Sequence, residues 1–148
     1  MEKLIESLKR HEGFSDTLYL DSERILTCGW GHALRPGGKL PEGVAEAFFK
    51  QDVADAVNAF DRIPKDLRDR LNVARRRVIV EMIFNLGLSG TLGFYKMWAA
   101  IGAGDFGEAA AEMLDSKWAD QVKGRAVKLA YIMRHGEVNH GTGKELLR

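Results

Sequence analysis

The pattern of apolar and polar positions predicts a helix at the start of the chain. Leu4, Ile5 and Leu8 recur at the spacing that places side chains on one face of a helix. Gly13 is typical of a helix C-terminal cap, since glycine adopts the backbone geometry that ends a helix. We therefore expect a short amphipathic helix that stops at Gly13.

The period changes after Phe14 and indicates a β-hairpin. Leu18 and Leu20 alternate with polar positions in a first strand, and the segment 21–24 has residues typical of a turn. The segment 25–28 then forms a second strand that runs back along the first. The turn lacks the glycine or asparagine that favours tight hairpins, so the signal is modest. A stretch rich in glycine and proline follows over 29–38 and predicts loop.

Helical spacing dominates the rest of the chain. The pattern predicts a helix over 41–60, a buried central helix that starts after Asn72 and ends at Gly87 and Gly90, and three more helices over about 94–101, 106–114 and 125–133. The tail 135–144 is expected to be loop. The fold class is therefore α+β, with an N-terminal helix, a small antiparallel β-hairpin lobe and a helical C-terminal lobe.

Length and composition favour one domain of 148 residues, 45% of them hydrophobic. We expect a small β lobe at about 13–40 and a helical lobe at about 60–137, joined by the helix at 41–60. Clefts between such lobes commonly bind ligands. The net charge of +1 at pH 7 disfavours a nucleic-acid-binding protein. With Cys28 as the only cysteine, no intramolecular disulfide is possible.

The sequence also gives an expectation about localisation. The N-terminus has charges scattered through it, as neither a signal peptide nor a signal-anchor does, and no run of 18 apolar residues occurs. We expect a protein of the cytoplasm without stable membrane association.

Two carboxylates and a hydroxyl between positions 12 and 27 are the first candidates for chemistry. Glu12 lies at a helix C-terminus, whose partial negative charge opposes ionisation and favours a general acid. Asp21, at the end of a strand, is expected to stay ionised, and Thr27 lies on the return strand. Two carboxylates in different environments suggest glycoside hydrolysis. The alternatives are a solvated surface Glu12, a turn-forming Asp21 and an ordinary strand Thr27.

The same residues carry a resemblance to a known family. The segments HEGF at 11–14 and YLDSERILTCGWGH at 19–32 resemble the signature of bacteriophage-type lysozymes, the endolysin muramidases. Four further segments match in order: FFKQDVADAV at 48–57, NVARRRVIVEMIFNLG at 72–87, GTLGF at 90–94 and SKWADQVKGRA at 116–126. The resemblance covers about residues 2 to 137. The segment 32–51 is shorter than in longer members of the family, so the β lobe is expected to be trimmed.

This resemblance implies roles and partners. Glu12 corresponds to the general acid, Asp21 to the carboxylate that orients or activates water, and Thr27 to the assisting hydroxyl. The implied substrate is peptidoglycan, cleaved at the β-1,4 bond between N-acetylmuramic acid and N-acetylglucosamine with inversion, by a monomer without metal or other cofactor. The resemblance also implies release from the host cytoplasm to the cell wall through a separate membrane pore, a holin.

Five further residues are candidates for substrate binding. Gly31 permits close approach of a sugar to the backbone, and His32 belongs to the same motif, although turn geometry and a structural hydrogen bond are the alternatives. Phe84 and Asn85 fall where the family lines its cleft, with plain core packing as the alternative for Phe84. Arg125 corresponds to an arginine that pairs with the acid, here Glu12.

The run Arg75–Arg77 has two interpretations. It is either a polyanion site or a solvated face compensated by Asp66 and Asp69, and the second is favoured. Two rival functions also remain: a lytic transglycosylase, which needs the acid but no water-activating carboxylate, and a non-catalytic domain that binds the cell wall or nucleic acid.

Overall fold

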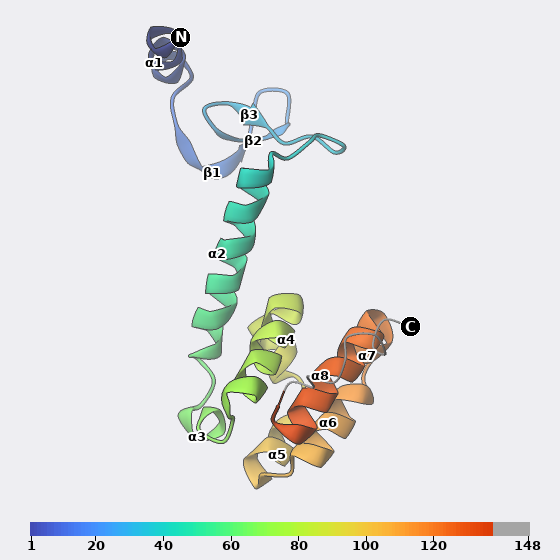
Figure 1. Cartoon of the computed structure of the whole chain (residues 1–148). Coiled ribbons are helices and arrows are strands. Elements are labelled where there is room, and N and C mark those ends of the chain that lie inside the picture. Colours follow the sequence, from blue (N-terminus) through green and yellow to red (C-terminus); the bar gives the residue numbers. More distant parts are fainter. Residues whose placement is uncertain (138–148) are drawn as a thin grey trace. The chain divides into compact units, whose positions relative to one another are not determined.

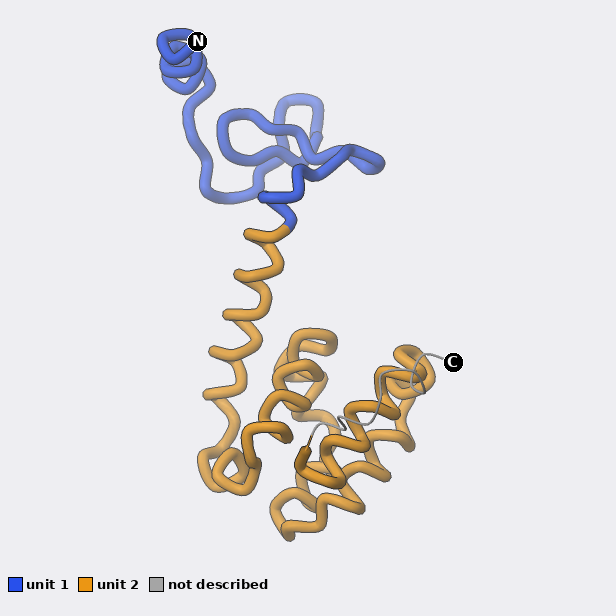
Figure 2. Tube along the Cα trace, in the orientation of Figure 1, with its two compact units in different colours: residues 1–45 blue, residues 46–148 orange. Residues whose placement is uncertain are grey.

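The computed structural model describes residues 1–137 and confirms the α+β class, with many helices and a small antiparallel sheet (Figure 1). The chain forms two compact units, Met1–Ala45 and Glu46–Arg148 (Figure 2). Helix α2 (Glu42–Phe60) begins in the first unit and continues into the second. The prediction of a single domain with lobes at 13–40 and 60–137 stays a prediction. The predicted loop at 135–144 lies mostly outside the described residues.

The first unit contains one helix and three strands. Helix α1 (Glu2–Glu12) is followed by β1 (Ser15–Leu20), β2 (Leu26–Gly29) and β3 (His32–Ala33), in the sheet order β1-β2-β3. Within residues 1–45, Thr27 is the only buried residue, with 3% of its surface exposed. The alternation of Leu18 and Leu20 therefore predicted the strand, but these side chains do not form a buried face.

The hairpin turn between β1 and β2 forms without glycine. The Arg24 N–H donates to the carbonyl of Asp21 (2.9 Å), and the Asp21 N–H donates to the carbonyl of Ile25 (3.0 Å). Arg24 has φ +62°, the left-handed conformation that closes a three-residue hairpin loop. An arginine therefore occupies a position where glycine is usual, which explains the modest turn signal in the sequence.

Replacement of Arg24 by glycine is expected to stabilise the first unit slightly. Glycine removes a left-handed strain of about 1–2 kcal/mol, and the greater freedom of the unfolded chain offsets roughly 0.5–1 kcal/mol of this gain. Arg24→Val, whose branched side chain tolerates this conformation poorly, is the opposite control. Urea unfolding followed by circular dichroism measures both. Equal stabilities of the two variants would contradict the assignment of strain to this residue.

The second unit is helical and has a continuous apolar core. After α2 its helices are α3 (Lys65–Arg68), α4 (Val73–Leu92), α5 (Tyr95–Ala103), α6 (Phe106–Leu114), α7 (Lys117–Val122) and α8 (Gly124–His135). The fully buried side chains include Ile79, Met82, Met97, Ile101 and Met113. These residues recur at helical spacing, so the apolar pattern of the sequence corresponds to this core.

Helix α4 differs from the predicted central helix. Its Val78, Ile79 and Met82 are buried as predicted, but Phe84 is 40% exposed, so the helix is not buried all round. Gly87 has φ +72° and ψ +167°, which breaks the helical geometry at the predicted position. A second helical segment follows this kink and continues to Leu92, so the predicted break at Gly87 is confirmed and the predicted stop at Gly90 was wrong.

The arginine run 75–77 is not the aspartate-compensated face that the sequence favoured. Arg75 donates from Nε to the Met133 carbonyl (2.7 Å) and from Nη2 to the Arg134 carbonyl (3.2 Å), both in the last turn of α8. Arg76 donates to the carbonyl of Leu71 (2.9 Å). Backbone carbonyl groups thus take the place expected for aspartates, and those of Met133 and Arg134 lie at a helix end, where carbonyls otherwise lack donors.

The predicted partner Asp69 is engaged elsewhere. Its carboxylate accepts a hydrogen bond from the ammonium of Lys65, one turn earlier in the chain, and this contact lowers the pKa of Asp69. Nearby Arg76 adds only a smaller lowering effect. The end of α8 therefore binds Arg75, backbone carbonyls before α4 bind Arg76, and Asp69 contributes only a smaller electrostatic effect at Arg76.

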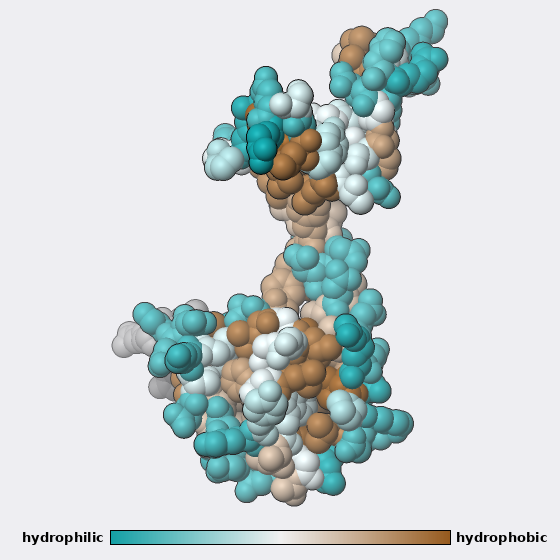
Figure 3. Space-filling model, turned by 180° about the vertical axis from the view of Figure 1, so that it is seen from behind, coloured by the Kyte–Doolittle hydropathy of each residue, from teal (hydrophilic) through white to brown (hydrophobic). Residues whose placement is uncertain are grey.

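The surface carries apolar side chains in both units, seen as brown areas among teal ones (Figure 3). In the first unit, Leu4, Leu18 and Trp30 are among them. Within residues 1–137, no single helix has both the length and the apolar composition of a membrane span; the bent pair α4 and α5 meets these criteria only together.

Candidate functional site

Glu12 is the last residue of α1, and its carboxylate lies beside a glycine loop. The exposed side chain is followed by Gly13, whose φ of +70° and ψ of +169° end the helix. A Cβ atom added to Gly31 would lie 3.4 Å from Glu12 Oε2, so the carboxylate is close to that residue. The helix end and the β2–β3 loop together therefore place an accessible carboxylate within the first unit.

Asp21 is held by two backbone N–H groups at the end of β1. Its Oδ1 accepts hydrogen bonds from the N–H of Glu23 (2.9 Å) and of Ile25 (2.8 Å). These bonds fix the rotation of the side chain, as in an Asx turn. Since both go to Oδ1, the second oxygen Oδ2 remains for a water molecule or a substrate.

Thr27 lies on the same face of the hairpin as Asp21. Tyr19 is the partner of Thr27 across the strands, and Asp21 follows Tyr19 by two residues, which returns it to the same face. The Thr27 hydroxyl donates to the Ile25 carbonyl (3.0 Å). Asp21 and Thr27 are therefore both anchored to Ile25, one through its N–H and the other through its carbonyl.

Gly31 and His32 follow directly along the sheet. Gly31 has φ +78°, which a residue with a side chain adopts only with strain, so glycine serves the turn as well as the approach to Glu12. His32 lies in β3 opposite Cys28 and is exposed. Within residues 1–137 its ring makes no hydrogen bond. The geometry thus favours neither a structural nor a catalytic role for His32.

Phe84, Asn85 and Arg125 lie in the second unit. The Asn85 side chain accepts a hydrogen bond from Trp118 Nε1 (2.9 Å), and the Phe84 ring is 5.8 Å from that of Phe49 in an edge arrangement. Arg125 Nη2 donates to Glu81 Oε2 (3.3 Å). The pairing of Arg125 with Glu12 that the resemblance implies stays a prediction.

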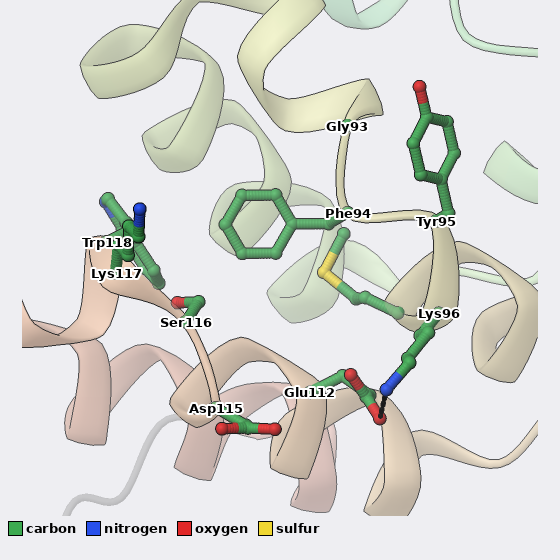
Figure 4. A pocket seen from close by; sticks show the side chains of 10 residues that line it. Gly93, Phe94, Tyr95, Lys96, Glu112, Asp115, Ser116, Lys117 and Trp118 are labelled. Atoms are coloured by element: carbon green, nitrogen blue, oxygen red, sulfur yellow. Dashed lines mark ion pairs between the residues drawn. The ribbon is translucent and has the colours of Figure 1, made fainter.

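The second unit also contains a pocket between α5, α6 and α7 (Figure 4). Its volume is about 420 Å³. The ring centroids of Phe94 and Trp118 lie 6.1 Å apart in an edge arrangement, and Lys96 Nζ lies 3.7 Å from Glu112 Oε1. Aromatic and charged groups side by side suit a polar ligand with an apolar part. None of the residues predicted for catalysis lines this pocket.

Sequence reasoning missed two residues that contact predicted site residues and a third, Trp30, that contacts the neighbours of Glu12 in the sequence. Trp118 binds Asn85, and the Ser-x-Trp segment was noticed only as part of the resemblance. Glu81 pairs with Arg125, and nothing in the spacing of 44 positions indicated it. Trp30 contacts Lys9 and Phe14 on either side of Glu12 in the sequence. Within residues 1–137, no cluster of three or more potential metal ligands occurs.

Comparison with known proteins shows which family the chain is similar to. Residues 9–136 match the family described as phage lysozyme. The pre-baseplate central spike protein Gp5 of Enterobacteria phage T4 is 27% identical; the match covers 91% of this chain but only 28% of the spike protein's length. Two proteins of Dictyostelium discoideum, probable T4-type lysozymes 1 and 2, are 24% and 22% identical, and each match covers at least 90% of both chains.

Proposed function

This chain belongs to the phage lysozyme family, and we propose that it degrades peptidoglycan by hydrolysing the β-1,4 bond between N-acetylmuramic acid and N-acetylglucosamine. The observation that supports this most is the joint anchoring of Asp21 and Thr27 to Ile25, in the unit that also presents Glu12. A pair of carboxylates is what glycoside hydrolysis needs, and the Thr27 hydroxyl is placed to assist Asp21.

Glu12 is the general acid of this proposal. Its accessible carboxyl group donates a proton to the glycosidic oxygen as the bond to the leaving sugar breaks. Gly31 leaves space beside Oε2, where any larger residue would bring a Cβ to 3.4 Å. The leaving sugar can therefore approach the acid without a side chain between them.

Asp21 and Thr27 orient the attacking water. The only hydroxyl proton of Thr27 is donated to the Ile25 carbonyl, so Thr27 Oγ1 can only accept a further hydrogen bond. A water that donates one proton to Asp21 Oδ2 and the other to Thr27 Oγ1 has both lone pairs free for the sugar carbon. Asp21 then takes up the proton that the water loses.

The decisive measurement is a digest of purified peptidoglycan with mass analysis of the products. We expect reducing N-acetylmuramic acid ends, each carrying the mass of one added water. Anhydromuramic ends would show the transglycosylase alternative, and binding without product would show a wall-binding domain. Because water attacks opposite the leaving group in this proposal, NMR of freshly formed ends should show the inverted anomer first.

The substrate-binding residues and the route to the wall belong to the same proposal. Gly31 and His32 in the first unit, and Phe84, Asn85 and Arg125 in the second, contact the glycan strand. The protein acts as a monomer without metal or cofactor and reaches the wall from the host cytoplasm through a holin pore. Sedimentation of the active protein tests whether it is a monomer, and digestion in the presence of a chelator tests whether it needs a metal.

A further inference from the structure

Helix α1 carries Glu12 but is weakly attached to its unit. No residue of α1 is buried, and within residues 1–137 no side-chain hydrogen bond or ion pair joins this helix to the sheet. A general acid must stay within hydrogen-bond distance of the oxygen that it protonates. Contacts other than burial must therefore hold the last turn of α1 in place.

Trp30 supplies such contacts on both sides of Glu12 in the sequence. Lys9 Nζ lies 4.3 Å from the centroid of the Trp30 ring, a cation–π contact. The Phe14 ring lies 4.7 Å away with its plane tilted by 47°. Lys9 precedes Glu12 by three residues, so both side chains project from the same face of the helix. One indole ring therefore restrains the chain before and after the acid.

The loop that carries Trp30 also lies beside the Glu12 carboxylate. Trp30 stands between Gly29 (φ +61°) and Gly31 (φ +78°), and these left-handed residues reverse the chain from β2 to β3. Gly31 is the residue whose Cβ position lies 3.4 Å from Glu12 Oε2. Holding α1 on the ring of Trp30 thus also sets the distance between Glu12 and the loop.

We propose that Trp30 is a positioning residue for Glu12, which it holds beside the Gly29–Gly31 loop through Lys9 and Phe14. This inference rests on the proposed function, because it concerns the acid of that reaction. The Trp30 side chain is also exposed enough, at 46%, for a sugar to stack on it. Positioning and stacking predict different kinetics, since misplacement of the acid lowers kcat whereas loss of uniform binding raises KM.

The test compares Trp30→Ala, Trp30→Phe, Lys9→Met and the double variant Lys9→Met/Trp30→Ala on soluble glycan strands. We expect Trp30→Ala to lower kcat by roughly tenfold to hundredfold, the effect of a misplaced catalytic group, with KM nearly unchanged. Lys9→Met should give a smaller loss of kcat and add little in the double variant, because both changes break one contact. Trp30→Phe keeps an aromatic ring and should restore most of the rate.

The matched control is Leu40→Ala, which removes an apolar side chain of nearly the same exposure, 45%, from the same unit. It should leave kcat and KM unchanged. Raised KM with normal kcat in Trp30→Ala, or normal kcat in a folded Trp30→Ala, would overturn the inference. If circular dichroism shows that Trp30→Ala does not fold, Lys9→Met on the exposed helix surface serves as the test. A lower kcat in this variant supports the inference, and an unchanged kcat overturns it. An inactive wild type would instead disprove the proposed function.

Discussion

Glu12→Gln is expected to reduce the release of reducing ends from peptidoglycan by a factor of about 10²–10⁴, the usual contribution of a general acid. Glutamine has the shape of glutamate but cannot donate a carboxyl proton. Since Glu12 is exposed at the end of α1, the fold should be unaffected, with a change in unfolding free energy within roughly 0.5 kcal/mol. Turbidity loss of peptidoglycan suspensions and thermal unfolding measure the two effects.

Glu6→Gln is the matched control for this experiment. Glu6 lies on the same helix, is exposed, and loses the same charge on substitution. Its activity should equal that of the wild type. Full activity of Glu12→Gln, or an equal loss in Glu6→Gln, would rule out Glu12 as the acid.

Asp21→Asn extends the test to the water. Asparagine can still accept the N–H groups of Glu23 and Ile25 through its Oδ1, so the turn should persist. The amide nitrogen that replaces Oδ2 cannot accept a proton from water. We expect a rate loss of about 10²–10⁴ for the loss of a general base. A normal rate would favour the transglycosylase alternative, which needs no water-activating carboxylate.

Arg75→Met is expected to destabilise the helical unit by roughly 2–4 kcal/mol, because two hydrogen bonds from a charged donor to the last turn of α8 are lost. The guanidinium also lies 3.5 Å over the Phe106 ring, and its burial lowers the pKa of Arg75. For a unit of this size, such a loss lowers Tm by about 10 °C or more. Differential scanning calorimetry measures this change.

Arg77→Met is the matched control. This substitution removes the same charge from the same helical turn, but the Arg77 side chain is exposed. Its effect should stay within roughly 0.5 kcal/mol. Gly136→Ala disturbs the same junction, between the start of α4 and the end of α8, from the α8 side. A Cβ at position 136 would lie 2.8 Å from Asn72 Nδ2. Equal stability of the Arg75 and Arg77 variants would show that net charge, and not the junction, matters.

The local elements followed from the sequence because their causes are local. The spacing of Leu4, Ile5 and Leu8 and the stop at Gly13 predicted α1. The alternation around Leu18 predicted β1, since the period of side chains in a strand needs only neighbouring residues. The order of the expected elements predicted the α+β class, which the structure confirms, and the order of motifs predicted the family, which the family match confirms.

The hydrogen-bond partners of the polar side chains in the hairpin could be predicted only in part from the sequence. The sequence placed Asp21 at a strand end and Thr27 on the return strand. Their common anchor, Ile25, became visible only from the register of the strands, because backbone donors and acceptors are the same in every residue. The role of Trp30 could not be predicted from the sequence either. Its contacts with Lys9 and Phe14 form only because the turn at 29–31 brings the ring to them.

The sequence by itself thus determined α1, the hairpin and most of the longer helices, which depend on short-range periodicity and backbone preference. The candidate residues came from local chemistry around Glu12 and from the resemblance of ordered motifs to a known family. The tertiary structure decided which polar groups meet across long separations. Arg75 serves the carbonyls of α8 some 58 positions away, and Arg125 meets Glu81 at a separation of 44. Such pairings depend on how helices pack in space, which no local pattern of residues specifies.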